Sequence, residues 1–290
     1  MDLLNINDIS VFYGKNPKPT IEHFSLDMKE GEVVSIVGES GSGKTTVIRA
    51  VLGLLPGGGS VRQGDILFQG NSLLKLNKTQ WRNLRGSDIS MIFQDSGAMI
   101  NPIRRIGDQF VEYIRTHQKC RRSRSESASA ARPASEQSEV AFPHMSKKDA
   151  WAKGVEMLEK MRLPDGDNIM RSYPFQLSGG MRQRVGIAMA MTFQPKLLLA
   201  DEPTSALDVT TQAQIVRQFM ELRDEYGTSM IVVTHNIGVA AYMADQLIVM
   251  QHGKVVDAGS RESVMSHPND DYTRNLLAAV PELEGKRYVS

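Results

Sequence analysis

The stretch GESGSGKT, residues Gly38–Thr45, fits the pattern G-x-x-x-x-G-K-[ST]. A short β-branched run at 32–37 precedes it, and from Thr45 to Leu55 the apolar residues take helical spacing. Glycines at such a turn let successive backbone N–H groups point inward, and the helix N-terminus adds positive potential. We therefore predict a phosphate-binding loop in which Lys44 reaches the β- and γ-phosphates of a nucleotide and the Thr45 hydroxyl binds Mg²⁺. A glycine-rich turn that merely precedes a helix is the alternative, and the lysine, the threonine and both flanking elements argue against it.

The composition is that of a globular chain with almost no net charge. The 290 residues are 41% hydrophobic and 23% charged, and 34 Lys+Arg against 33 Asp+Glu give a net charge of +1. These values exclude global disorder, a collagen-like chain and a coiled coil, and they provide no overall basic field that would favour nucleic acid. The single cysteine, Cys120, can form neither an internal disulfide nor a cysteine-based metal site. No signal-peptide pattern and no run of about eighteen apolar residues is seen, so we expect a soluble cytoplasmic protein.

Apolar runs and helical spacing predict an α/β chain. Strands are expected at 3–10, 32–37, 64–70, 89–93, 196–200 and 230–234, and the last two are nearly continuous apolar runs, as in a parallel sheet covered on both faces. Helices are expected at 45–55, 147–162, 182–192 and 212–226. The stretch 119–139 is rich in arginine and serine and has no aromatic residue. We expect a solvated, partly disordered insertion there, with regulation or contact with an anionic surface as the alternative.

Two adjacent acids follow the apolar run at 196–200. Asp201 would deliver a carboxylate to Mg²⁺, and Glu202 could polarise an attacking water. The pair could also be a helix N-cap with Pro203 next, but the upstream phosphate loop favours the nucleotide interpretation. A GTPase would carry an N-K-x-D guanine motif, whereas Asn77-Lys78 is followed by Thr-Gln, which weakens that alternative.

The stretch LSGGMRQR at 177–184 lies between the phosphate loop and these acids. With this motif in this order, the sequence resembles the ATP-binding subunits of ABC transporters, and the resemblance covers essentially residues 1–260. It implies a P-loop NTPase core with a mixed, mainly parallel sheet, an inserted α-helical signature subdomain and an N-terminal antiparallel β part. It also implies that the signature contacts the γ-phosphate held by the other protomer of a dimer.

The resemblance assigns further roles residue by residue. It implies that Tyr13 stacks on adenine, that Gln94 senses Mg²⁺ and the membrane partner, and that His235 is the switch histidine at the γ-phosphate. Asp208, in SALD at 205–208, would act in the loop that communicates across the dimer. The full set is catalytic Lys44, Glu202 and His235, metal-binding Thr45, Gln94 and Asp201, and ATP-binding Tyr13, Gly38, Ser40, Gly41, Ser42, Gly43, Lys44, Thr45, Thr46, Gln94, Ser178, Gly179, Gly180 and Asp208.

Within the family, the sequence is most similar to the oligopeptide, dipeptide and nickel importer branch. The matching stretches are GESGSGK at 38–44, MIFQD at 91–95 with NP at 101–102, YPFQLSGGM at 173–181, ADEPTSALDVT at 200–210 and the tail from 268 to 281. Four residues at three places depart from the branch: Ser96 replaces a proline, Asn236 replaces an aspartate, and Asp270-Asp271 replaces His-Pro. The chain also stops before the cysteine-containing extension that peptide importers commonly carry, which favours nickel, a metal–metallophore complex or another small solute over oligopeptides.

The resemblance implies a specific division of the chain. The ATP-binding domain would span 1–260, with a core at 1–93 and 193–260, a helical subdomain at 94–192 containing a flexible insertion at 119–146, and a C-terminal helical tail at 261–290. We expect an ATPase that uses ATP and Mg²⁺ and powers a membrane permease for import of a small solute.

The partners implied are two permease subunits, a second ATP-binding subunit of the same or a homologous chain and, indirectly, an extracytoplasmic solute-binding protein. The location would be peripheral, at the cytoplasmic face of the inner membrane. A soluble ABC ATPase acting on nucleic acid or ribosomes, favoured only by the Arg-rich stretch, and an exporter subunit are the alternatives.

Overall fold

The computed structural model describes residues 2–94, 99–130, 145–205, 207–279, 282–283 and 286–287, with side chains omitted at 120–130 and beyond 279. The chain divides into two compact units. The first unit holds residues up to 76, 196–205 and from 212 onward, and the second holds 77–195 and 206–211. The second unit thus begins at Asn77 rather than at residue 94, where the sequence placed the helical subdomain.

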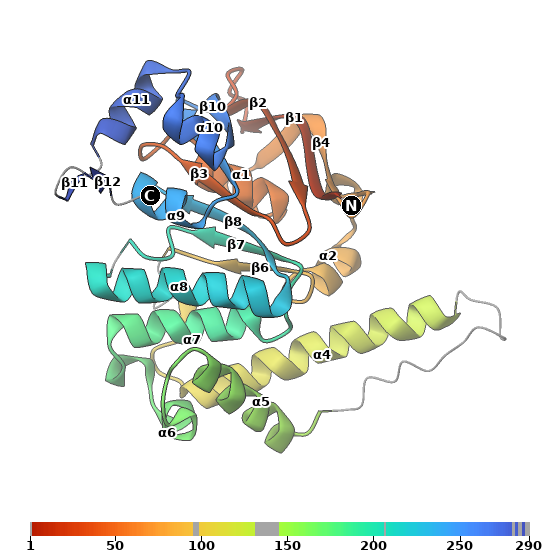
Figure 1. Cartoon of the computed structure of the whole chain (residues 1–290). Coiled ribbons are helices and arrows are strands. Elements are labelled where there is room, and N and C mark those ends of the chain that lie inside the picture. The colour runs from red at the N-terminus through yellow and green to blue at the C-terminus, as the bar shows by residue number, and fades with distance from the viewer. Residues whose placement is uncertain are drawn as a thin grey trace. The chain divides into compact units, whose positions relative to one another are not determined.

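An antiparallel sheet occupies the N-terminal part of the first unit, with strand order β2-β1-β4-β5 (Figure 1). Its strands are β1 (Asp2–Tyr13), β2 (Ile21–Lys29), β4 (Gly59–Phe68) and β5 (Asn71–Ser72). Along β2, buried and exposed residues alternate, so one face of the strand packs inward and the other is polar. The antiparallel part expected from the resemblance is therefore present, although β4 begins five residues before the predicted Gly64.

The second sheet of this unit is mainly parallel and has the order β10-β9-β3-β8-β7 within the unit. The strands are β3 (Val33–Val37), β7 (Leu197–Asp201), β8 (Ser229–Thr234), β9 (Gln246–Gln251) and β10 (Lys254–Ser260). β3 pairs in parallel with β8 and β9, β7 pairs in parallel with β8, and β10 pairs antiparallel with β9. Because β3, β7 and β8 are parallel, the residues that follow them emerge at one edge of the sheet.

Five helices accompany this sheet in sequence: α1 (Lys44–Val51), α8 (Val209–Tyr226), α9 (Ile237–Met243), α10 (Arg261–Ser266) and α11 (Asp271–Ala278). A 3-10 turn, η1, spans Leu73–Lys75. The helix predicted at 45–55 ends earlier, because Gly53 adopts a left-handed conformation (φ 64°) just after the C-cap Leu52. Among the described residues of the tail, the last helix ends at Ala278, and β11 (Glu282–Leu283) and β12 (Lys286–Arg287) form an antiparallel pair, so the helical tail predicted for 261–290 also contains strands.

The second unit is mostly helical. It contains α2 (Lys78–Leu84), β6 (Ile89–Ile92), α4 (Ile106–Ala130), α5 (Lys147–Lys160), α6 (Gly166–Arg171), η3 (Pro174–Gln176) and α7 (Gly179–Met191). Its core includes Phe110, Ile114, Leu158 and Met170, and the Trp151 Nε1–H donates to Asp167 at 2.7 Å, which links α5 to the N-terminal turn of α6. Capping boxes at Asn77 and Ser146 fix the starts of α2 and α5.

The predicted flexible insertion at 119–146 begins as helix. α4 continues to Ala130 without interruption, because arginine, serine, glutamate and alanine are compatible with a helix even where no apolar face demands one. Residues 131–144 lie outside the described part of the chain. Among the described residues, no helix combines the length and apolar character needed to span a membrane.

Candidate nucleotide site

The predicted phosphate loop connects β3 to α1 in the first unit. Gly38 has φ 148°, and a Cβ there would lie 2.1 Å from the Met250 carbonyl oxygen on β9. Gly43, the N-cap of α1, has φ 101°, and its Cβ would lie 2.2 Å from Ile21 Cδ1 on β2. Both positions therefore require glycine for conformation and for space, and the loop is held against both sheets of the unit.

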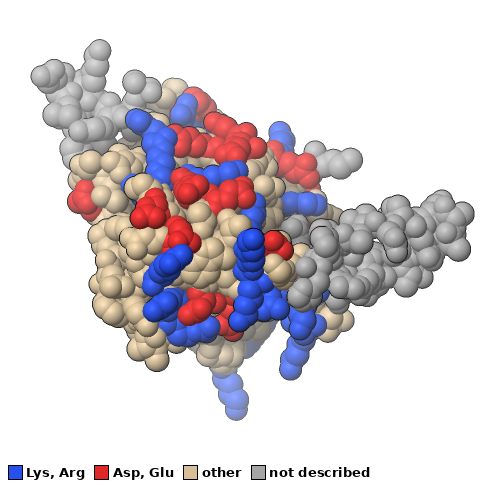
Figure 2. Space-filling model, turned by 90° about the horizontal axis from the view of Figure 1, so that it is seen from below, with Lys and Arg blue, Asp and Glu red and all other residues tan. Residues whose placement is uncertain are grey.

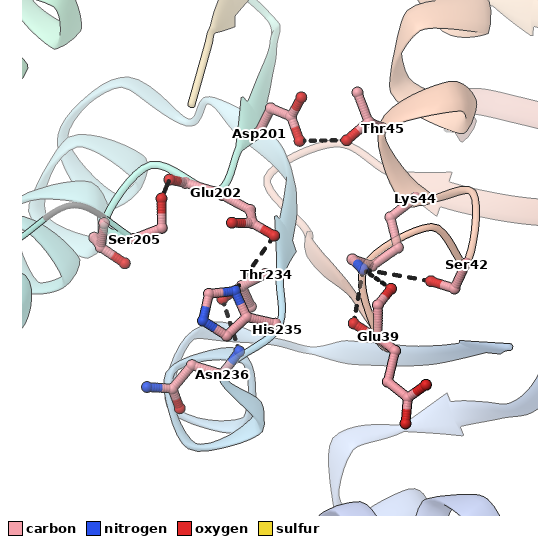
Figure 3. A network of polar contacts seen from close by, with 12 residues as sticks. Glu39, Ser42, Lys44, Thr45, Asp201, Glu202, Ser205, Thr234, His235 and Asn236 are labelled. Carbon is pink, nitrogen blue, oxygen red and sulfur yellow. Dashed lines mark hydrogen bonds and ion pairs between the residues drawn. The ribbon is translucent and has the colours of Figure 1, made fainter. Parts of the chain in front are cut away.

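Lys44 lies at the centre of the loop, as Figure 3 shows. Its Nζ donates to the carbonyl oxygens of Gly38 and Glu39, each at 2.7 Å, and to Ser42 Oγ at 3.3 Å. The side chain is buried, and this desolvation lowers the pKa of Lys44, with the carboxylates of Glu202, Asp201 and Glu39 opposing the shift. The loop backbone thus curls around a cation, which is the group that phosphate oxygens would engage.

Thr45 and Asp201 are brought together from α1 and the end of β7. The Thr45 hydroxyl donates to Asp201 Oδ1 at 2.8 Å (Figure 3). Burial raises the pKa of the Asp201 carboxyl, and the hydrogen bond from Thr45 and the charges of Arg49 and Lys44 offset part of that increase. A hydroxyl and a buried carboxylate are hard oxygen donors of the kind that Mg²⁺ accepts, so these two residues fit the predicted metal site.

Glu202 takes an unusual backbone conformation at the end of β7. Its φ is 45°, a strained value for a residue with a side chain, and its N–H donates to the Val233 carbonyl at 2.8 Å. Its own carbonyl accepts hydrogen bonds from the Ser205 N–H at 3.2 Å and from the Ser205 hydroxyl at 3.1 Å. These hydrogen bonds hold the Glu202 backbone in this conformation.

His235 follows β8 and faces Glu202. The Nδ1 atom of His235 lies 3.3 Å from Glu202 Oε1, with 59% of the histidine side chain and 17% of the glutamate side chain exposed (Figure 3). A partly buried carboxylate next to a solvent-accessible imidazole can orient the ring and leave its Nε2 to act on a ligand. The structure therefore brings together Lys44, Thr45, Asp201, Glu202 and His235, all in the first unit.

Asn236, one of the departures from the family pattern, has a structural role that aspartate would share. Its side-chain oxygen accepts from the Val239 N–H at 3.2 Å and caps α9, and its own N–H donates to Thr234 Oγ1 at 3.0 Å. Asn and Asp are equally good N-caps, so the substitution keeps the helix start and removes one negative charge. Another departure, Ser96, lies outside the described residues.

The signature residues begin α7 in the second unit. Ser178 is the N-cap, and its hydroxyl accepts from the Met181 N–H at 3.3 Å. Ser178 and Gly179 are exposed, so the N-terminal turn of this helix is accessible to an anion. Gln94, just after β6, is also exposed and also belongs to this unit.

Thr211 links the signature to the loop acid, a connection that the sequence analysis missed. The Asp208 carboxylate accepts from the Thr211 N–H at 2.9 Å and from its hydroxyl at 2.8 Å, and these bonds lower the pKa of Asp208. A Cβ on Gly180 would lie 2.9 Å from Thr211 Cγ2, so Gly180 also packs against this threonine. The spacing Asp208-x-x-Thr211 at the start of a helix was the available signal, because an N-cap aspartate bonds to the third helical residue.

Tyr13, the predicted adenine contact, ends β1. It pairs with Gly59 of β4, and a Cβ on that glycine would lie 2.6 Å from the tyrosine ring. The ring is half-buried and packs over the glycine backbone, which leaves part of its surface for a ligand. Among the described residues, no group of three or more His, Cys, Asp or Glu side chains forms a metal-binding cluster.

Comparisons with known proteins find relatives over most of the chain. A family model described as ABC transporter matches residues 21–205. The dipeptide transport ATP-binding protein DppD of Bacillus subtilis (strain 168) is 41% identical over 261 residues, which cover 90% of this chain and 70% of that protein. The oligopeptide transport ATP-binding protein OppD of Haemophilus influenzae is 37% identical over 286 residues, covering 98% of this chain and 80% of that protein.

A solved structure supports the same assignment. The ATP-binding cassette MJ0796, in a dimeric post-hydrolysis state bound to ADP and Pi, matches with a TM-score of 0.70 and 26% identity, covering 89% of this chain and 98% of that one. The family match, the relatives and the solved structure point to the same family. The chain therefore belongs to the ABC transporter family, as one of its ATP-hydrolysing, ATP-binding cassettes.

Proposed function

We propose that this chain hydrolyses ATP to power a membrane permease that imports short peptides. The observation that carries the proposal is the position of the Glu202 carboxylate, 3.3 Å from His235 in the unit that also holds the Lys44 loop. The names of the two relatives, for dipeptide and oligopeptide transport, support a peptide as the solute. The preference for nickel that the sequence analysis drew from the chain's end stays a prediction, and neither relative's name supports it.

The loop binds the triphosphate. Backbone N–H groups of residues 40–46 donate to phosphate oxygens, and the Lys44 ammonium donates to the β- and γ-phosphates from its place inside the loop. Thr45 and Asp201 would hold Mg²⁺, and the ion would supply positive charge that stabilises the phosphate oxygens. Tyr13 stacks on the adenine ring.

Glu202 and His235 carry out the chemistry. The Glu202 carboxylate orients a water molecule, whose oxygen attacks the γ-phosphorus while its proton passes to the carboxylate. The bond between the γ-phosphorus and the bridging oxygen breaks, and ADP leaves with the electron pair. In its doubly protonated form, His235 donates from Nδ1 to Glu202 and from Nε2 to a γ-phosphate oxygen, which stabilises the developing charge.

A second ATP-binding chain, either another copy or a homologous chain, completes each site. Ser178, Gly179 and Gly180 then contact the γ-phosphate bound in the opposite protomer through the N-terminus of α7. Asp208 and Thr211 connect that helix start to the loop that communicates across the dimer. The dimeric state of the MJ0796 cassette supports this arrangement.

The dimer acts on a permease of two subunits, which receives solute from an extracytoplasmic binding protein. This places the chain as a peripheral subunit at the cytoplasmic face of the membrane. Transport requires the permease to bind the open and closed ATPase dimers with different free energies, because only a differential affinity can shift its conformation.

Transport by the native complex tests the proposal. The full chain is purified with its membrane partners, the partners are identified, and the complex is placed in vesicles with ATP on the side of this chain. We expect ATP-dependent uptake of a radiolabelled dipeptide, no uptake with Lys44→Ala, and normal uptake with Lys148→Ala, an exposed lysine used as the control. Uptake of Ni²⁺ without dipeptide uptake would assign a metal solute, and purification without any membrane protein would contradict the transport role.

A further inference from the structure

Helix α11 contacts the phosphate loop through Tyr272. The Tyr272 hydroxyl accepts a hydrogen bond from the Glu39 N–H at 2.8 Å, across 233 residues of sequence. The Tyr272 N–H in turn donates to Asp270, the N-cap of α11, at 2.8 Å. The sequence of this segment predicts only a tail that resembles others of its branch, with no role in the ATP site.

The peptide group that Tyr272 contacts is the one that holds Lys44. The Glu39 N–H belongs to the same peptide unit as the Gly38 carbonyl, whose oxygen accepts from Lys44 Nζ at 2.7 Å. The Glu39 carbonyl accepts from the same Nζ, also at 2.7 Å. A peptide that donates at its N–H becomes a better acceptor at its oxygen, so the tyrosine hydroxyl strengthens and orients the contact that places the lysine.

Helix α11 is itself firmly placed relative to the loop. Its Leu277 belongs to a buried cluster that includes Val37, the residue before the loop, and Ile237, two residues after His235. Tyr272 and Leu276 pack against this cluster. The residue just before the N-cap of α11 is held in place as well. Asn269 donates to Asp257 from its backbone N–H at 2.8 Å and from its side-chain amide at 3.1 Å.

We infer that Tyr272 is a positioning residue of the ATP site, which sets the orientation of the Gly38–Glu39 peptide and through it the position of Lys44. The inference rests on the proposed role of Lys44 in phosphate binding. Removing the hydroxyl leaves the ring in its packing and frees the peptide to rotate, so the lysine loses one constraint. Phosphate affinity falls, while the fold and the catalytic pair Glu202 and His235 stay unchanged.

Three variants of the full chain separate this role from a merely structural one. Tyr272→Phe removes only the hydroxyl, Leu276→Ala weakens the packing of the same helix without touching the loop, and Lys44→Ala removes the proposed phosphate contact. For each, the dissociation constant of ADP with Mg²⁺ is measured by calorimetry, KM and kcat are measured for ATP hydrolysis, and Tm is measured without nucleotide.

Loss of one hydrogen bond predicts a dissociation constant and a KM about three- to tenfold higher for Tyr272→Phe, with kcat and Tm close to those of the native chain. Leu276→Ala should lower Tm and leave the dissociation constant within about twofold, because only packing is lost. Unchanged ADP affinity in Tyr272→Phe, or an equal loss in Tyr272→Phe and Leu276→Ala, would overturn the inference. Native affinity in Lys44→Ala would instead overturn the proposed phosphate site, so the two failures are distinguishable.

Discussion

Asp201 is a buried carboxylate that its neighbours only partly compensate. Burial raises its pKa, while Thr45, Arg49 and Lys44 act in the opposite direction. The ionised form is therefore less favourable in the folded chain than in the unfolded chain. The ionised form is also the one that would bind Mg²⁺, so the charge state that the proposed function needs reduces the stability of the fold.

Because ionised Asp201 is unfavourable in the folded chain, Asp201→Asn should increase stability, and the gain should depend on pH. A raised pKa in the folded state means that stability decreases as pH rises from the ordinary aspartate value through the raised one. The asparagine variant keeps an oxygen that can accept from Thr45 and carries no charge, so it should be more stable than the native chain at pH 7. The gain should disappear near pH 3.5, where Asp201 is protonated.

Urea midpoints at the two pH values measure this difference. Asp2→Asn, at an exposed position, serves as the control and should change neither midpoint. Equal stability of Asp201→Asn and the native chain at pH 7 would show that Thr45, Arg49 and Lys44 compensate the charge completely.

Much of the site could be predicted at the residue scale, because Lys44, Thr45, Asp201 and Glu202 stand in local patterns next to recognisable strands. Their exact contacts could not. The strained φ of Glu202 depends on hydrogen bonds to Val233 and Ser205, and the contact from Tyr272 to Glu39 joins residues 233 positions apart. No local sequence pattern encodes such a distant pairing.

At the scale of elements, caps explain how the functional helices start. Ser178 begins α7, Asn236 begins α9 and Asp270 begins α11, each through a side-chain oxygen that accepts a backbone N–H. Each of these helix starts includes or adjoins a residue proposed to act at the ATP site: the signature residues at α7, His235 before α9 and Tyr272 in α11. The family departure at Asp270-Asp271 therefore supplies a cap for α11, much as Asn236 does for α9.

Replacing each of the two adjacent acids at the start of α11 should reduce the free energy of unfolding by a different amount. Asp270→Ala removes the N-cap and should reduce the free energy of unfolding by about 1 kcal/mol. Asp271→Ala removes a side chain from the first turn that pairs with Arg274 at the exposed surface and should cost only a few tenths of a kcal/mol. Chemical denaturation of both variants measures the difference, and equal losses would remove the assignment of Asp270 as the cap.

Element types were predictable wherever apolar spacing was regular, as in β7, β8 and α8. The ends were less predictable. Helix α1 stops early because of the conformation of Gly53, and α4 continues to Ala130 through residues that the composition suggested were unstructured. A polar composition indicates that a segment is not buried, but it does not exclude a helix. For this reason the composition did not predict that α4 continues to Ala130.

At the scale of the whole molecule, one chain carries one phosphate loop in its first unit and one signature in its second. Charged groups of both signs are interspersed on the face seen in Figure 2, in keeping with a net charge of +1 and without a single basic field. On this face (Figure 2), the described residues therefore form no basic patch of the kind that binds nucleic acid.

The proposed shared site predicts nucleotide-dependent association. Full-length Glu202→Gln should bind ATP with Mg²⁺ without hydrolysing it and should double in mass, because ATP then bridges the loop of one copy and the signature of another. Lys44→Ala under the same conditions should remain a monomer. Sedimentation velocity measures both, and a Glu202→Gln chain that stays monomeric at saturating ATP would assign the second half of the site to a homologous chain.

ATP hydrolysis by Glu202→Gln, measured together with the affinity of the variant for ATP, tests most directly whether Glu202 is the base that activates water. The variant keeps the size and hydrogen-bonding capacity of the side chain and loses the base, so turnover should fall at least about 100-fold while the dissociation constant of ATP with Mg²⁺ changes less than about twofold. Glu30→Gln, at an exposed position after β2, should hydrolyse ATP normally. ATP turnover by Glu202→Gln at the native rate would contradict the assignment of Glu202 as this base.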